Sequence, residues 1–552
     1  MGNGKNSQSS VESVTSTISS AKLIVIDFSI MMTLKNNDLL DWLKRNIIQD
    51  SKIVMVTPEF YRSYQILEKS ESSEQIIIAQ NAREFINAIG KSKSLKINRQ
   101  YASTESLINA LISNPDVLFM LADYSEAAEA VRNAKEPKAS VLFGVLDGRI
   151  GCMKAEDYIQ KAPVAPFSDP SKSFVSIKRV PGINDEVTDA DGRKIQLSKV
   201  ISKGGEGTIF ITDVDGYVCK IFHSHRINFE KSEKLKYLVN RPVRFEGICW
   251  PEKIVYDEDQ IPVGYLMKTA RGKSMSSIFD GEDMLVESFP GIQRSDLVKI
   301  CISLFEQYHY LHLLGVVVGD IRMNNVIIDD NAKTYLVDLD SCQIENFPCC
   351  VGDEDYTPAE LQGKDFSTFM RTFYNERFSW SVIGFNCLFL GQHPYAQRNG
   401  QDTIADEIAL HTFRYPIDDD EDDSLIPMGC YRDIWGITPK EIRSFFYDVF
   451  KRDERIPLAC ALLMLDKYYS YLTDEDTIAS KVNLVNPEPD DTQIVLIKNN
   501  DLGTGDSYNN NEPTADDPPD KKKDHSRGFR IALIAALSVL AAIAAIIIFM
   551  LL

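Results

Sequence analysis

The sequence predicts an α/β domain with a parallel sheet in three layers, then a larger α+β domain, then a single transmembrane helix at the C-terminal end. Three observations support this order. Short apolar runs alternate with helix-like segments over residues 21–162, a second globular stretch spans 175–475 after a proline-containing break, and 531–552 is apolar throughout. With 552 residues, 44% of them hydrophobic, the chain is neither a small disulfide scaffold nor a fully disordered protein.

The charge balance limits the classes of partner. The chain carries 60 basic and 80 acidic residues, a formal net charge of −20. This balance argues against a surface that follows the phosphates of a duplex, so we expect no nucleic-acid partner except through the N-terminal domain. Ten cysteines show no C-x-x-C spacing and mostly lie in apolar surroundings, which is typical of reduced thiols in a reducing compartment.

The N-terminal region combines a polar leader with alternating strand and helix signals. Residues 1–20 are rich in Ser, Asn and Gly and contain no long apolar run, so they are predicted to be a disordered leader and not a signal peptide. Strands alternating with helices imply a parallel sheet with helices on its faces. The strand-like runs are 23–26, 53–56, 117–121 and 141–143, and the helix-like stretches are 39–48 and 125–134.

Three carboxylates follow predicted strands of this domain: Asp27, Asp123 and Asp147. Because the carboxyl ends of parallel strands share one edge of a sheet, they could converge on one or two magnesium ions for phosphodiester hydrolysis. The stretches 26–29 and 121–125 resemble a PIN-like nuclease domain. A receiver-like or purely binding α/β domain is the preferred alternative, and Asp123 could instead cap the helix that follows it.

A glycine-rich turn opens the second domain. Gly204, Gly205 and Gly207 lie between two apolar, strand-like runs. Such a turn lets backbone N–H groups approach phosphates closely, although a plain hairpin turn would use the same residues.

A lysine lies inside the next strand-like run. Lys220 belongs to the apolar segment Tyr217–Phe222, where a buried ammonium group needs a carboxylate or phosphate partner. Glu230 or Glu233, on the helix-like stretch that follows, would supply the carboxylate.

The middle of the second domain contains three polar residues at fixed spacing among apolar ones. Asn325 follows Asp320 by five positions, and Asp338 follows Asn325 by thirteen. This spacing, downstream of the glycine turn and the strand lysine, resembles the protein kinase superfamily. The resemblance implies that Asp320 aligns the substrate hydroxyl and that Asn325 and Asp338 hold Mg²⁺. It also implies that Lys220 positions the phosphates of ATP and that Glu233 orients Lys220.

Flanking segments extend the resemblance over the range 175–475 and imply a two-lobed, α+β, kinase-like fold. Tyr356–Glu360 resembles the element that closes a kinase activation segment, with Glu360 paired to Arg455. The stretch Gly264–Lys268, which includes Met267, would be the hinge that meets adenine with its backbone groups.

The sequence also departs from the common kinase pattern. The His-Arg pair that usually precedes the catalytic aspartate is Val318-Gly319, so no arginine is expected there to bind a phosphorylated activation loop. Asp340 replaces the glycine after the metal-binding aspartate, where it would stiffen the loop or add a second carboxylate near magnesium. These forms are similar to bacterial serine/threonine kinases encoded beside von Willebrand A proteins and metal-dependent protein phosphatases. The similarity implies a cognate protein phosphatase as a partner.

After the second domain the sequence becomes polar and then strongly apolar. Residues 483–530 contain prolines and runs of Asn and Lys, so they are predicted to be a flexible tether. Ile531–Leu552 would span about 33 Å as a helix, enough for a hydrocarbon core of about 30 Å. Basic residues precede this run and none follows it, which predicts a single-pass, tail-anchored membrane protein with its N-terminal domains in the cytoplasm.

Together the patterns predict a membrane-anchored serine/threonine protein kinase that uses ATP and Mg²⁺ to phosphorylate protein substrates in signalling. Two alternatives remain. An ATP-binding pseudokinase scaffold is suggested by the missing His-Arg pair and the altered Asp-Leu-Asp sequence. A membrane-tethered, magnesium-dependent nuclease under the control of the kinase domain is suggested by Asp27, Asp123 and Asp147.

Overall fold

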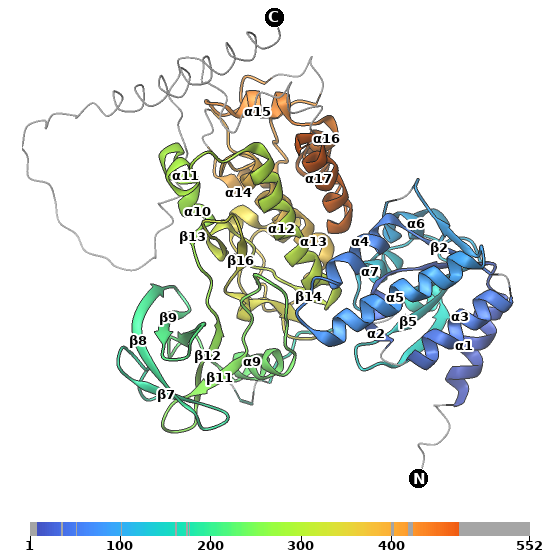
Figure 1. Cartoon of the computed structure of the whole chain (residues 1–552), viewed down its shortest axis with the longest axis horizontal. Helices are drawn as coiled ribbons and strands as arrows, with labels where there is room; N and C mark the ends of the chain where they lie inside the picture. Colours follow the sequence, from blue (N-terminus) through green and yellow to red (C-terminus); the bar gives the residue numbers. More distant parts are fainter. Residues whose placement is uncertain are drawn as a thin grey trace, which may run out of the picture. The chain divides into compact units, whose positions relative to one another are not determined.

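The N-terminal part of the chain folds around a six-stranded sheet with the order β3-β2-β1-β4-β5-β6 (Figure 1). The structure is a computed structural model and describes residues 8–473 except 35–36, 51, 101, 161–162, 170, 173–174, 176, 399–401 and 418–422. The strands are β1 (Leu23–Ile26), β2 (Ile53–Val56), β3 (Leu95–Ile97), β4 (Val117–Ala122), β5 (Ser140–Gly144) and β6 (Ile150–Lys154). The first five run parallel, whereas β6 is antiparallel to β5 because a short turn joins the two.

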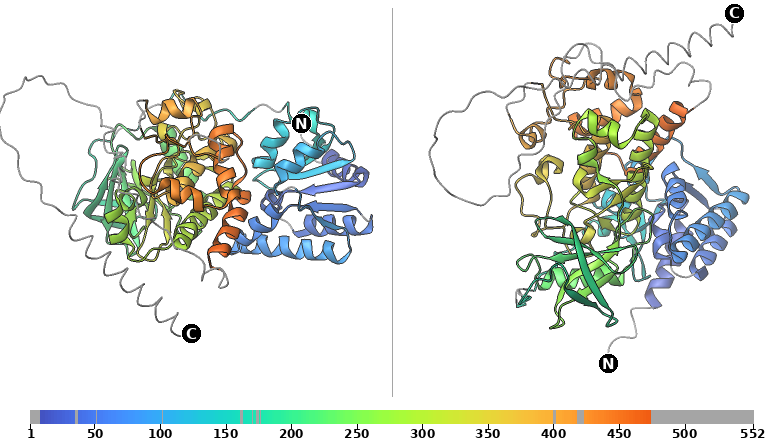
Figure 2. Two further views of the ribbon diagram at one scale, coloured as in Figure 1. Left: turned by 90° about the horizontal axis from the view of Figure 1, so that it is seen from above. Right: turned by 60° about the vertical axis from the view of Figure 1, so that its left-hand side comes forward.

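Helices cover both faces of this sheet and give it three layers (Figure 2). Successive strand residues face opposite sides, so Ile24 and Ile26 pack with one set of helices while Val25 packs with the other. The first set is α1 (Gln8–Ser20), α2 (Ser29–Thr33), α3 (Asn37–Gln49), α4 (Pro58–Leu67) and α5 (Ser73–Lys91). The second set is α6 (Thr104–Leu111), α7 (Glu126–Arg132) and α8 (Ala155–Tyr158).

Helix α1 differs from the disordered leader expected for residues 1–20. Within this helix Val14 and Ile18 lie one turn apart and are 9% and 1% exposed. Burial of the face that carries Val14 and Ile18 stabilises the helix. The composition of residues 1–20 is mostly polar, and composition alone does not detect two apolar residues at helical spacing. Residues 1–7 lie outside the described part of the chain.

The second domain begins with a closed six-stranded barrel in the order β10-β12-β11-β7-β8-β9. Its inward-facing apolar residues, such as Val187, Phe210 and Val263, form a core of their own. The strands are β7 (Glu186–Asp189), β8 (Lys194–Lys203), β9 (Gly207–Thr212), β10 (Tyr217–Phe222), β11 (Lys253–Tyr256) and β12 (Pro262–Lys268). Helix α9 (Phe229–Asn240) lies between β10 and β11 in the sequence.

The remainder of this domain is mainly helical. Helices α12 and α13 are buried along most of their length because α12 packs against α13, α17 and α4, so neither shows one clear polar face. The helices are α10 (Met275–Ile278), α11 (Glu282–Ser288), α12 (Arg294–Leu313), α13 (Phe373–Leu388), α14 (Ile404–Ala409), α15 (Tyr431–Ile437), α16 (Lys440–Tyr447) and α17 (Leu458–Thr473). The short strands are β13 (Lys273–Ser274), β14 (Val316–Val317), β15 (Val326–Ile328), β16 (Thr334–Leu336) and β17 (Gln343–Ile344).

One hydrophobic core joins the sheet of the first domain to the helices of the second. Helix α4 packs against α12 and α17, and Ile66 and Leu304 belong to the same buried cluster. All described residues fall into one compact unit. The two domains expected from the sequence are therefore packed together through apolar contacts.

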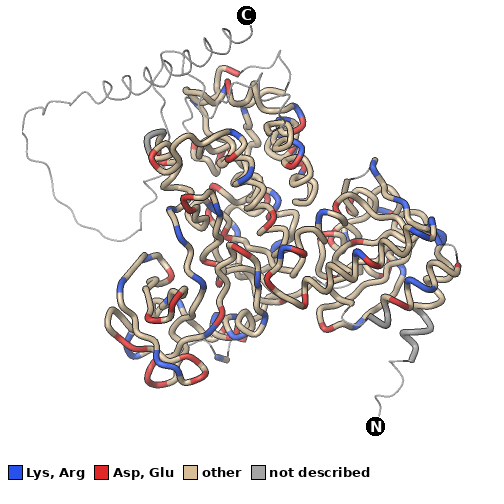
Figure 3. Tube along the Cα trace, in the orientation of Figure 1, with Lys and Arg blue, Asp and Glu red and all other residues tan. Residues whose placement is uncertain are grey.

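The predicted tether and transmembrane helix, 483–530 and 531–552, lie outside the described residues. Within residues 8–473, as far as they are described, no helix is both long and apolar enough to cross a membrane. Lys and Arg are interspersed with Asp and Glu along the described trace (Figure 3).

Candidate active site

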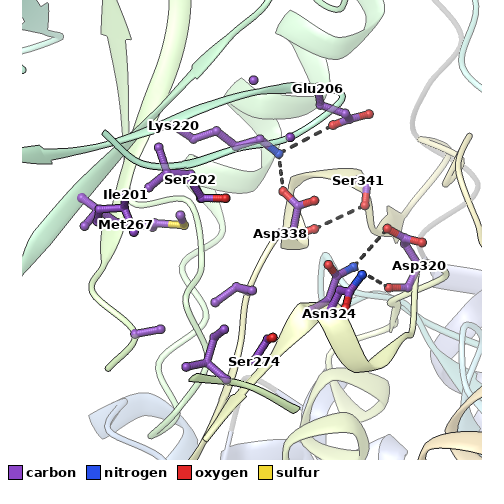
Figure 4. Close-up of a pocket in the computed structure, with 18 of the residues that line it drawn as sticks. Ile201, Ser202, Glu206, Lys220, Met267, Ser274, Asp320, Asn324, Asp338 and Ser341 are labelled. Carbon is purple, nitrogen blue, oxygen red and sulfur yellow. Dashed lines mark hydrogen bonds and ion pairs between the residues drawn. The ribbon is translucent and has the colours of Figure 1, made fainter. Parts of the chain in front are cut away.

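A cavity of about 620 Å³ lies between the barrel and the helical part of the second domain. The three predicted glycines and Met267 line it from the barrel side, together with Lys220 (Figure 4). Asp320, Asn325 and Asp338 line it from the helical side. Of the residues considered for a nucleotide site in this domain, Glu233, its alternative Glu230 and Asp340 are not among those that line the cavity.

The glycine turn joins β8 to β9 and has two different environments. A Cβ atom on Gly207 would lie 2.3 Å from the carbonyl oxygen of Ile221, so the close pairing of β9 with β10 requires glycine there. A Cβ atom on Gly205 would meet nothing within 4 Å. Gly205 lines the cavity with open space beside its Cα atom, as close approach of a phosphate group would require.

Lys220 is buried on β10 and contacts three carboxylates. Its Nζ atom donates to Oδ1 of Asp340 at 2.7 Å and to Asp338, and it lies 3.6 Å from Oε2 of Glu206. Burial alone would lower the pKa of Lys220, but these carboxylates raise it above its ordinary value. Lys220 is therefore a fully charged ammonium group at the cavity wall.

The structure does not place Glu233 beside Lys220. Glu233 pairs instead with Lys236 on its own helix, α9, at 2.7 Å. The part of α9 nearest the cavity carries Lys231, whose Nζ atom lies 3.3 Å from Oδ2 of Asp340. Because α9 presents an ammonium group here, the carboxylates that hold Lys220 come from the opposite wall and from the glycine turn.

Asp340 lies beside Lys220, where the sequence predicted Glu233. It is 2% exposed and accepts hydrogen bonds from Lys220 and from the hydroxyl of Tyr265, the latter at 2.7 Å. Burial alone would raise its pKa, but Lys220 and Lys231 hold the pKa below its ordinary value. Asp340 lies two residues after Asp338, and the 3₁₀ turn Leu339–Ser341 directs both carboxylates to Lys220. This short spacing in the sequence could have indicated that Asp340 contacts the lysine.

Asp320 and Asn325 form the opposite part of the site. The Nδ2 atom of Asn325 donates to the backbone oxygen of Asp320 at 2.9 Å and to its Oδ2 atom at 3.0 Å. Burial raises the pKa of the Asp320 carboxyl, and Arg322, 3.7 Å away, opposes this shift. Asp338 has a φ of 62°, a left-handed conformation that is uncommon outside glycine and is typical of functional turns.

Gly319, the residue before the predicted catalytic Asp320, has both of its backbone groups hydrogen-bonded to side chains. The N–H of Gly319 donates to Oε2 of Glu376 at 2.7 Å, and its carbonyl accepts from Nη1 of Arg371 at 2.5 Å. Arg371 also donates to the carbonyl of Val351 at 2.5 Å. Gly319 has a φ of 76°, and a Cβ atom there would lie 2.6 Å from Sγ of Cys349, so no arginine side chain fits. Sequence spacing gave no indication that Arg371 would reach this loop.

Two further predictions for this domain have different outcomes. The pairing of Glu360 with Arg455 is confirmed, with two parallel contacts of 2.7 and 2.8 Å. The predicted hinge is displaced, because residues 264–268 belong to β12, whose backbone pairs with β10 and β11. Met267 lines the cavity, and Lys268–Ala270 form the connection that borders it.

The strand-end aspartates of the N-terminal domain are each engaged by neighbouring side chains. The pairs are Asp27 with Ser29, Asp123 with both Arg132 and Tyr158, and Asp147 with Arg149. Among the described residues, no group of three or more His, Cys, Asp or Glu side chains is placed to hold a metal ion. The cap of α7 is Ser125 and not Asp123.

Comparison with known proteins gives partial matches to two related sequences. No family model matches the chain. It is 27% identical over 246 residues to protein kinase YegI of Escherichia coli (strain K12), which covers 42% of this chain and 37% of that protein. It is also 27% identical over 240 residues to protein kinase YegI of Escherichia coli O157:H7, which covers 41% and 36%. The match thus spans little more than a third of these curated relatives, and it supports a relationship to protein kinases.

Proposed function

We propose that this protein is an ATP-dependent protein kinase that phosphorylates serine or threonine. The observation that carries the proposal is one cavity that collects the glycine turn, Lys220, Asp320, Asn325 and Asp338. These residues have the types and the order that phosphoryl transfer requires. The relationship to protein kinases supports the same reaction class.

The residues of the cavity fit ATP and Mg²⁺. Asp338 and Asn325 offer the hard oxygen donors that Mg²⁺ prefers, and both line the same wall. The backbone at Gly205 has space for a phosphate group beside it. When bound, Mg²⁺ would neutralise the charge on the transferring phosphoryl group.

The chain's own residues would orient the phosphates and the acceptor hydroxyl. Lys220 would donate to phosphate oxygens, and Asp340, which is buried and does not line the cavity, would keep its contact with Lys220. Asp338 would then be available to the metal. Asp320, whose pKa burial raises, would orient the acceptor hydroxyl and take its proton.

We further propose that residues 531–552 anchor the protein in a membrane with its folded domains in the cytoplasm. The apolar run and the basic residues before it support this placement. A cognate protein phosphatase that reverses the reaction belongs to the same proposal and is supported by the family resemblance.

Transfer of radiolabelled γ-phosphate by the purified full chain in mild detergent tests the function. We expect magnesium-dependent labelling of protein serine or threonine, and a loss on the order of a thousandfold in Asp338→Ala, which removes a proposed metal ligand. The matched variant Asp259→Ala removes an exposed carboxylate paired with Lys178 and should label like the wild type. ATP binding without transfer would favour the scaffold alternative, and label on tyrosine alone would contradict the proposed acceptor.

A further inference from the structure

A path of buried polar side chains connects the N-terminal domain to the residue before Asp320. Oε1 of Glu126, on α7, lies 2.9 Å from Nδ1 of His312, on α12. Nε2 of His312 lies 2.8 Å from Oε1 of Glu376, on α13. Oε2 of Glu376 accepts the hydrogen bond from the N–H of Gly319 at 2.7 Å. Three contacts therefore span both domains and end at the proposed catalytic loop.

Most of the path is buried, although Glu126 also lines a pocket of about 290 Å³. The side chains of Glu126, His312 and Glu376 are 14%, 3% and 1% exposed. Burial alone would lower the pKa of His312, but hydrogen bonds to the two carboxylates raise the pKa to about 9. The ring is therefore an imidazolium that donates from both nitrogens, and each donor requires its own acceptor.

A second set of contacts docks the N-terminal domain on the first turns of α13. Nη2 of Arg377 lies 2.6 Å from Oε2 of Glu126, and Nη1 lies 2.6 Å from Oε2 of Glu105. The carboxylate of Glu129 accepts from the N–H of Phe373, the first residue of α13, at 3.0 and 3.1 Å. An anion is favoured at this end of a helix. The N-terminal domain thus holds the same turns of α13 that carry Glu376.

We infer that Glu126 and His312 are positioning residues for Asp320, through which the N-terminal domain holds the proposed catalytic loop in place. Without the carboxylate of Glu126, the buried cations His312 and Arg377 would lack an anion that both now contact. His312 would then pair with Glu376 alone, and this change would weaken the hydrogen bond that Glu376 accepts from Gly319. The effect on turnover rests on the proposed kinase function, whereas the effect on the order of the loop does not.

The same interface contains a matched control. Oε1 of Glu306, on α12, lies 2.8 Å from Nη2 of Arg62, on α4, and 2.6 Å from Nζ of Lys69. Glu306 is a buried glutamate paired across the two domains, as Glu126 is, but among the described residues its ion pairs lead to Arg62 and Lys69 and not to the catalytic loop. Glu306→Gln therefore makes the same chemical change in the same interface without breaking the path.

Hydrogen–deuterium exchange and kinetics of the full chain test the inference together. We expect Glu126→Gln to raise amide exchange in the peptide covering 316–322 by about tenfold, because the N–H of Gly319 loses its acceptor more often. We also expect kcat to fall by about tenfold while KM for ATP stays within about twofold, because Lys220 and the glycine turn are not on the path. Glu306→Gln should change both quantities by less than about twofold.

Three outcomes are decisive. Equal behaviour of Glu126→Gln and Glu306→Gln would show a general structural role and overturn the inference. Exchange at 316–322 that rises only in Glu126→Gln supports it even if the wild type transfers no phosphate, a result that would instead refute the kinase proposal. If Glu126→Gln does not fold, Glu126→Asp keeps the charge and shortens the side chain, and exchange unchanged from wild type in a folded Glu126→Asp would also overturn the inference.

Discussion

Two groups of ion-paired residues use the same residue types in different surroundings. The cavity cluster consists of Glu206, Lys220, Lys231, Asp338 and Asp340, and the interface cluster consists of Glu105, Glu126, His312, Glu376 and Arg377. In the cavity cluster the side chains of Asp338 and Glu206 are 29% and 24% exposed, whereas Lys220 and Asp340 are 4% and 2% exposed. In the interface cluster His312, Glu376 and Arg377 are no more than 3% exposed, whereas Glu126 and Glu105 are 14% and 26% exposed.

The partly exposed carboxylates at the cavity and the buried pair His312–Glu376 differ in how easily they can change partners. A partly exposed carboxylate loses little when its lysine moves to another anion, because water replaces the contact. A buried charge has no such replacement and depends on its partner. The cavity cluster is thus suited to rearrange when phosphates bind, and the interface cluster is suited to preserve one geometry.

Removal of the central cation should have the largest effect. Arg377→Met leaves Glu126 and Glu105 without a partner that contacts both, so we expect unfolding in urea to need about 3–5 kcal/mol less free energy. Arg452→Met removes an arginine that is 55% exposed and should cost less than about 0.5 kcal/mol. Similar losses in the two variants would contradict the contrast between exposed and buried pairs.

The interface cluster should also make stability depend on pH. The pKa of His312 is raised from 6.5 to about 9, so its stabilising contribution is complete below pH 6.5 and is lost as the pH rises through 9. The shift corresponds to about 3 kcal/mol. Urea unfolding at a series of pH values should show this decline in the wild type and in His225→Gln, an exposed control, but not in His312→Gln. If the free energy of unfolding of His312→Gln declined in parallel with that of the wild type, the pH dependence would come from other groups.

Within the cavity cluster, the buried carboxylate, Asp340, should have the largest effect on activity among the acidic residues. Asp340→Asn keeps the shape of the side chain but removes the charge that holds Lys220, so we expect kcat/KM for phosphoryl transfer to fall on the order of a hundredfold. Nucleotide titration monitored by thermal unfolding separates loss of ATP binding from loss of turnover. Wild-type kinetics in this variant would mean that Asp338 and Glu206 suffice to orient the lysine.

The smallest effect should come from the residue that the sequence favoured. Glu233→Gln affects only the pair with Lys236, so kcat/KM should stay within about twofold of the wild type. The same assay compares it directly with Asp340→Asn. A loss as large as that of Asp340→Asn would restore Glu233 as the partner of Lys220 during turnover.

The sequence was sufficient to predict the residues of the candidate site where their spacing along one segment sets their positions. The intervals between Asp320, Asn325 and Asp338 and the lysine within a strand predicted residues that line one cavity. Glu360 and Arg455 were paired correctly because the resemblance to the protein kinase superfamily implies this contact.

The sequence was insufficient where the partner depends on how elements pack. The orientation of α9 decides whether Glu233 or Lys231 meets the cavity, and both occur on the same short helix. The contact of Glu126 with His312 depends on the docking of two domains, which no local pattern specifies. Val14 and Ile18 of α1 were not recognised in a polar stretch for a similar reason, because their burial requires the rest of the domain.

The shared interface has a consequence for how the two domains change over evolution. Because Glu126 belongs to one domain and Arg377 and His312 belong to the other, a mutation that removes one of these charges takes an ion-pair partner from at least one buried group across the interface. Neither domain can drift independently at these positions, and a recombination event that exchanged only the N-terminal domain would be retained only if the incoming domain supplied a matching carboxylate. In an alignment of homologues, position 126 should therefore vary together with positions 312 and 377, and the two domains should be inherited as a pair.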